Sequence, residues 1–181
     1  MTESSGKNTN SDDMLRYKRL VFYSEEVDKI NELLSDFLDS SQAKAALLVD
    51  VEGHLVTKMG YTKSLDTESL SALIAGSFAS TRQVARILGE KEFTEIFHQG
   101  TNDSIYISLI RDRSMAVVIF DNRTTIGMVK FYLEELSQKV GVVMKQAEEK
   151  MESGETQAQD ELLDENFGES VKDRLDDLFD L

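Results

Sequence analysis

Apolar residues recur along this chain at two spacings, and the spacings predict its elements. Between residues 24 and 41 the spacing is helical, and the apolar face is formed by Val27, Ile30, Leu34, Phe37 and Leu38. Ser24 is placed to cap this helix, and the acids that follow it suit the positive end of the helix dipole. The run AALLVDV at 45–51 then predicts a short strand, with a turn at Glu52 and Gly53 and a hairpin partner at 54–59.

A second helix is predicted over residues 67–88, with Asp66 as its N-cap and Gly89 just past its end. The side expected to pack on the sheet carries Leu70, Leu73, Ile74, Phe78, Val84, Ala85 and Leu88. A water-facing side is normally charged. The opposite side instead carries small residues followed by two polar ones: Ala72, Ala75, Gly76, Ala79, Gln83 and Arg86. We interpret it as a partner-binding face, and the alternative is a neutral surface helix.

Three further strands are predicted at 92–99, 104–110 and 115–120, joined by short turns. A last long helix, from about residue 125 to about residue 150, carries an apolar face of Met128, Phe131, Leu136, Val140 and Val143. The predicted order is α-β-β-α-β-β-β-α. Tight turns favour antiparallel pairing, so the fold class is α+β, a five-stranded antiparallel sheet with helices on its faces.

The two ends of the chain differ from this domain, which we place at residues 23–150. Residues 1–22 form an N-terminal extension whose first 13 residues are polar and predicted to be disordered. The stretch MLRYKRLVFY at 14–23 mixes basic and apolar residues, and either begins the fold or acts as a small docking segment. A linker at 151–160 leads to an acidic amphipathic segment, 161–181, predicted to bind a partner through Val171, Leu175, Leu178 and Phe179.

Composition narrows the class of protein. The sequence has no cysteine and no apolar run of the ~18 residues that cross a bilayer. We therefore expect a cytoplasmic protein without membrane insertion. Whether it gathers at a cell pole stays open. The net charge is −14, and residues 148–181 alone hold 13 acids and 3 bases. Such a tail repels nucleic acid, which is not expected as a partner. It either solubilises the chain or seeks a basic protein surface.

No residue pattern predicts catalysis. His54 and His98 lie in different strands without metal-ligand spacing, and GYTKS lacks the glycine that a phosphate loop needs before its lysine. We therefore expect no catalytic, cofactor-binding or metal-binding residues, and a binding protein rather than an enzyme. One cation raises a question: Arg123 follows the buried strand in VVIFDNRTTIG, and it either reaches a partner's active site or holds its own loop.

Four stretches resemble the Roadblock (dynein light chain) family, in particular its bacterial MglB branch. They are LLVDVEGHLVTKMG, DTESLSALIAGSFAS, EFTEIFHQGTNDSIYISLI and VVIFDNRTTIGMVK, within a span from about Ala45 to about Val140. The acidic, apolar LDDLF near the C-terminus is similar to that branch too. The resemblance implies a Roadblock-type fold and a homodimer whose sheets join edge to edge and whose second helices pair.

The resemblance also implies a function, the regulation of a Ras-like small GTPase of the MglA type. MglB-like proteins stimulate GTP hydrolysis by this GTPase and act in bacterial cell polarity and motility. Their C-terminal segment can contact a second GTPase surface, so activation, nucleotide exchange or both stay open. The alternative is a Roadblock-type scaffold or adaptor dimer with no effect on hydrolysis.

The family's GTPase-facing positions fall on Ala75, Ala79 and Gln83 of this chain. Gln83 departs from the small residue common there, which predicts a looser or differently tuned contact. The N-terminal extension is longer than is usual in the family. The resemblance also implies that no arginine is inserted into the GTPase, so Arg123 is expected to organise its own loop, where Asp121 and Asn122 can form turn bonds and a threonine can cap the last helix.

Overall fold

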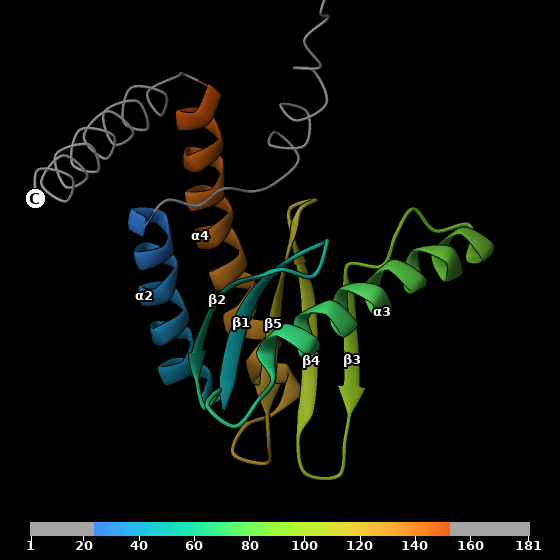
Figure 1. Cartoon of the computed structure of the whole chain (residues 1–181). Helices are drawn as coiled ribbons and strands as arrows, with labels where there is room; N and C mark the ends of the chain where they lie inside the picture. Colours follow the sequence, from blue (N-terminus) through green and yellow to red (C-terminus); the bar gives the residue numbers. More distant parts are fainter. Residues whose placement is uncertain (1–23, 153–181) are drawn as a thin grey trace, which may run out of the picture. The chain divides into compact units, whose positions relative to one another are not determined.

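The structure, a computed structural model, describes residues 24–152 (Figure 1). The N-terminal extension, the linker beyond residue 152 and the C-terminal segment with Val171, Leu175, Leu178 and Phe179 lie outside the described residues. The chain divides into two compact units after Val143. The first holds the sheet and most of the helical residues, and of the second the structure describes the end of the last helix.

The order of the elements confirms the predicted fold class. They are α2 (Ser24–Ser41), β1 (Ala45–Asp50), β2 (Leu55–Gly60), α3 (Thr67–Leu88), β3 (Glu95–Gln99), β4 (Ser104–Ile110), β5 (Ser114–Phe120) and α4 (Ile126–Glu152). The five strands form one sheet in the order β2-β1-β5-β4-β3, and all neighbours are antiparallel. β5 is central and buried throughout, whereas β2 and β3 form the two edges.

The helices cover both faces of the sheet. α3 crosses one face, and α2 and α4 lie on the other (Figure 1). Side chains alternate between faces along a strand. Leu47, Val49, Val117 and Ile119 accordingly form one core with Ile74 and Phe78 of α3. The alternate residues of β1 and β5, also buried, face the α2 and α4 side.

The predicted apolar face is confirmed more fully for α2 than for α4. In α2, Ile30, Leu34 and Phe37 are buried as predicted. In α4, the prediction of an inward face is right for Leu136, Val140 and Val143 and wrong for Met128 and Phe131, which are 44% and 69% exposed. Val129 and Leu133 are buried instead. They precede Leu136 and Val140 by seven residues each, so they share that face, whereas Met128 and Phe131 are rotated away from it.

The structure also bears on membrane insertion. Among residues 24–152, none of the helices combines the length and the apolar character that crossing a bilayer requires.

Candidate partner-binding surface

Both ends of α3 are fixed as the sequence predicts. The Asp66 side chain accepts a hydrogen bond from the Ser69 amide at 3.1 Å. Hydrogen bonding by the Ser69 side chain, and then by its amide, lowers the pKa of Asp66 below its ordinary value. Gly89 adopts the left-handed conformation at φ 77°, and its amide donates to carbonyl groups of the last turn. The helix is therefore bounded by its own sequence.

The predicted rotation of α3 about its axis needs correction. Ala75, assigned to the outer face, is only 6% exposed and belongs to the core. Leu73, Val84 and Leu88, assigned to the sheet side, are exposed. The side that packs inward carries Ile74 and Phe78 together with smaller residues, namely Thr67, Ser71, Ala75 and Ala85. Small residues there have a structural reason, because they let α3 approach the strands closely.

The turn between β1 and β2 supplies part of that reason. Gly53 has φ 98°, a conformation that side chains disfavour, and an added Cβ would lie 3.0 Å from Cα of Ala72 and 3.3 Å from Cβ of Ala75. The turn thus lies against α3 at two of its alanines. Ala72 and Ala75 are therefore explained in part by contacts within this chain.

The outer face of α3 keeps the other predicted residues and gains apolar ones. Ala72, Gly76, Ala79, Gln83 and Arg86 are exposed, as a partner-binding face requires. Leu73 and Ile87 join them at 73% and 84% exposure. Five residues at intervals of three and four form what we call the α3 stripe: Leu73, Gly76, Ser80, Gln83 and Ile87. This is the spacing of a seam between paired helices.

Ile87 was not among the predicted residues of this face, although the sequence held a signal for it. The prediction grouped residues by size, and Ile87 is large. The alternating intervals of three and four would have placed Ile87 with Gly76 and Gln83, whatever its size.

The centre of the α3 stripe is open. A Cβ added to Gly76 would meet no atom within 4 Å, so nothing within the described chain requires a glycine there. The Ser80 hydroxyl donates to the Gly76 carbonyl oxygen at 2.9 Å. Charge is sparse: in a chain of net charge −14, residues 67–88 hold one acid, Glu68, and two bases, Arg82 and Arg86. The stripe is nearly neutral and apolar at both ends, which suits a protein partner.

Arg123 is held by its own loop. Its Nε donates to Oδ1 of Asp121 at 2.9 Å, and its backbone amide donates to the same oxygen at 3.1 Å. The guanidinium also lies 5.9 Å from the ring centroid of Tyr61. These hydrogen bonds lower the pKa of the Asp121 carboxyl. Thr125 caps α4 by accepting a hydrogen bond from the Met128 amide at 3.3 Å, as predicted for a threonine of this loop.

The turn after β1 gathers three residues that could serve as metal ligands. Within the described chain, Asp50, Glu52 and His54 place ligand-type atoms within 4.8 Å of one another. Oδ1 of Asp50 accepts hydrogen bonds from the amides of Glu52 and His54, and Oδ2 lies 2.8 Å from Nδ1 of His54. These bonds are those of an aspartate that organises its own turn, and they explain the cluster without a metal.

The architecture defines the class of protein. An antiparallel sheet of order β2-β1-β5-β4-β3, with one helix on one face and two on the other, carries a helix whose outer face is apolar and nearly uncharged. Residues 29–120, half of the chain, match the family model of the Roadblock/LC7 domain, and the chain belongs to this family.

Solved structures of MglB proteins are similar to the chain over 70% of its length and 96% of theirs. Myxococcus xanthus MglB is 37% identical with a TM-score of 0.66, and the gliding protein MglB from Thermus thermophilus is 27% identical with a TM-score of 0.66. An MglB described as having a tetrameric arrangement is 26% identical with a TM-score of 0.67. Among curated proteins, the comparison found no match.

Proposed function

We propose that the chain is a homodimeric regulator of a Ras-like small GTPase of the MglA type. It stimulates GTP hydrolysis, has no active site of its own and acts in bacterial cell polarity or motility. One observation carries the proposal: the chain is 37% identical to Myxococcus xanthus MglB over 96% of that protein. The name of the Thermus relative, a gliding protein, fits a role in motility.

The α3 stripe supports self-association. Leu73 and Ile87 each lie seven residues from Ser80, so two antiparallel copies of α3 centred on Ser80 would bring Leu73 of each copy to Ile87 of the other. Small residues at the centre allow the two backbones to approach. β3 adds an edge strand with free backbone groups on its outer side, which a second sheet could cover.

Oligomeric state tests this arrangement directly. Light scattering at micromolar concentration should give the mass of a dimer. Exchanging Leu73 and Ile87 for lysine should reduce the mass to that of a monomer, because four cations would meet at the seam. Gln138→Lys with Gln146→Lys, two exposed positions of α4 away from the stripe, adds the same two cations to each chain and should stay dimeric.

The GTPase contact is assigned to the exposed residues of α3 around Ala79. Ala79→Arg places a long cation where a close approach is expected, and should abolish GTPase binding with little loss of fold, because Ala79 points to solvent. Gln146→Arg puts the same cation on an exposed position of α4 and should bind normally. Unchanged affinity of Ala79→Arg by calorimetry would show that another surface binds.

Hydrolysis separates the two candidate functions. Single-turnover GTP hydrolysis by the GTPase should accelerate when the chain is added, and Ala79→Arg should remove the acceleration. Tight binding with no change in hydrolysis would make the protein a scaffold or adaptor. Release of a fluorescent GDP analogue, followed with and without the chain, would show whether nucleotide exchange is also stimulated.

A further inference from the structure

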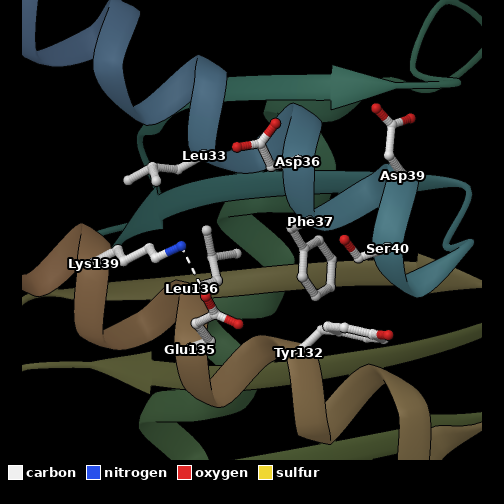
Figure 2. A pocket seen from close by; sticks show the side chains of 9 residues that line it. All are labelled: Leu33, Asp36, Phe37, Asp39, Ser40, Tyr132, Glu135, Leu136 and Lys139. Atoms are coloured by element: carbon white, nitrogen blue, oxygen red, sulfur yellow. Dashed lines mark ion pairs between the residues drawn. The ribbon is translucent and has the colours of Figure 1, made fainter.

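A groove runs between α2 and α4 on the face of the sheet opposite α3. It encloses about 330 Å³. Phe37 and Leu136 lie in its centre, between Asp36 and Asp39 on the α2 side and Tyr132 on α4 (Figure 2). Phe37 and Leu136 are buried, whereas the two aspartates are exposed. The groove therefore offers an apolar floor with an acidic rim.

The described residues balance only part of the charge on this rim, because the lining has three acids, Asp36, Asp39 and Glu135, and one cation, Lys139. Lys139 lies 2.8 Å from Glu135 (Figure 2), and this carboxylate, with a smaller contribution from Asp36, raises the pKa of Lys139. Within residues 24–152, Asp36 and Asp39 form no ion pair. Both lie near the C-terminal end of α2, whose last turn carries no base. The negative end of the helix dipole adds to their field, so a cation is favoured there.

We propose that this groove binds residues 14–23 of the same chain, the segment MLRYKRLVFY. The segment carries Arg16, Lys18 and Arg19 and no acid, and no stretch of ten residues elsewhere in the chain has three bases without an acid. Its other side chains are all apolar or aromatic. It therefore matches an apolar floor with an acidic rim in both respects. The proposal does not depend on the function proposed above.

Chain length permits the contact. The segment ends at residue 23, directly before α2 begins at Ser24. Along α2, Asp36 lies twelve residues from Ser24, about 18 Å at the helical rise of ~1.5 Å per residue. An extended chain spans at most ~3.3–3.6 Å per residue, so Arg19 reaches roughly 17 Å back along the helix and Arg16 roughly 27 Å. Arg16 can therefore lie beside Asp36 after one reversal of direction, whereas the backbone of Arg19 falls just short of it.

A spin label tests the contact in the full chain. Because the sequence has no cysteine, Ser40→Cys gives a unique attachment point for a nitroxide at the groove. In ¹⁵N-labelled protein the amide signals of residues 14–23 should broaden. They should recover at about 1 M salt, where the Debye length falls to ~3 Å. A nitroxide at Lys91→Cys, in the exposed loop after α3, is the control and should leave these signals sharp.

Charge exchange makes the test specific. Asp36→Lys with Asp39→Lys should abolish the broadening, and adding Arg16→Glu, Lys18→Glu and Arg19→Glu should restore it. Sharp signals in the parent protein, or broadening that survives the aspartate changes, would overturn the proposal.

The alternative occupant of the groove is the same segment from a second copy of the chain. A mixture of isotope-labelled chains without nitroxide and unlabelled chains with nitroxide reports only contacts between copies. The signals of residues 14–23 should stay sharp in this mixture. If these signals broaden as strongly as in chains that carry both the isotope label and the nitroxide, the segment docks on another molecule and the intramolecular proposal is wrong.

Discussion

At the scale of single residues, Arg123 shows how contacts within a loop can keep an arginine from reaching a partner's active site. Its guanidinium is joined to Asp121 at 2.9 Å and lies near the ring of Tyr61. The carboxylate raises the pKa of Arg123 and keeps it charged. To reach a phosphate in a partner, Arg123 would have to leave both contacts. The geometry thus favours a role in the loop at residues 121–125.

Lysine should replace Arg123 without large loss. Under the proposed function, Arg123→Lys should keep most of the stimulation of GTP hydrolysis, because lysine retains the charge that pairs with Asp121. A true arginine finger contributes about 10³ to 10⁵ in rate, and lysine substitutes for it poorly. Single-turnover hydrolysis decides: a fall on the order of a thousandfold with intact binding would make Arg123 the catalytic residue.

Tyr106 predicts a specific loss of stability at high pH. Its hydroxyl is buried, and burial, helped by the nearby Glu95 carboxylate, raises the pKa of Tyr106 from 10.0 to about 12. The neutral hydroxyl is thus favoured in the folded state. Its contribution is complete below pH 10 and is lost as the pH rises toward 12.

Comparison with a phenylalanine variant isolates this effect. Tyr106→Phe retains the ring that packs in the core but has no group to ionise. Chemical denaturation between pH 10 and 12 should show a steeper loss for the parent than for the variant. The other four tyrosines are common to both proteins, so identical pH profiles would exclude Tyr106 as the cause.

At the scale of elements, the sequence predicted which segments form helices and strands better than which sides face inward. Helix caps such as Asp66 and Gly89 depend on local hydrogen bonds, and the structure confirms both of them. The rotation of α3 depends on what the helix meets. Ala75 is buried by the approach of the Gly53 turn, a contact between residues 22 positions apart that no helical period encodes.

The exposed apolar residues of α3 and α4 have a related cause. A sequence shows that Leu73, Ile87 and Phe131 are apolar, but it does not show whether such side chains are buried by the same chain or by another one. The prediction assigned Leu73 and Phe131 to faces that pack within the chain, and this assignment rotated both helices about their axes. Five of the six residues that the prediction assigned to the outer face of α3 are nevertheless exposed, because a face with little charge is visible in the sequence.

Alanine at two glycines should have opposite effects. Gly53→Ala should lower the free energy of unfolding by ~1–3 kcal/mol, because φ 98° is strained for alanine and the new methyl group lies 3.0 Å from Cα of Ala72. Gly76→Ala should raise it by up to ~1 kcal/mol, because the site is open and alanine favours helix.

Urea denaturation at two protein concentrations measures both changes. If α3 pairs with a second copy, the methyl group of Gly76→Ala should weaken association while it stabilises each chain. A destabilisation of Gly76→Ala that does not depend on protein concentration would mean that this side of α3 packs within its own chain.

At the scale of the whole molecule, charge and fold are separated along the sequence. Residues 1–147 hold 21 acids and 17 bases, whereas residues 148–181 have a net charge of −10. The five strands and the described helices lie within residues 24–152. We therefore expect the acidic residues after 152 to matter for contacts that depend on charge.

Truncation after Glu155 should leave the fold and the dimer intact. It removes nine acids and two bases but none of the described residues. Thermal unfolding should be little changed, and under the proposed function part of the stimulation of hydrolysis should remain. GTPase binding should weaken mainly at low salt, because exposed charges are screened beyond ~10 Å at 0.1 M. A large drop in the melting temperature would show that the tail belongs to the core.

The position of α3 on the sheet has a consequence for motion. Its C-terminal half extends past β3 (Figure 1), and after Phe78 the helix buries only Ala85 among its described residues. Helices of a few turns are marginal in water without such support. The last turns of α3 should therefore open locally at a lower free energy than the domain unfolds. A partner that covers Ile87 would also stabilise these last turns in the helical state, so association and local folding are one coupled equilibrium.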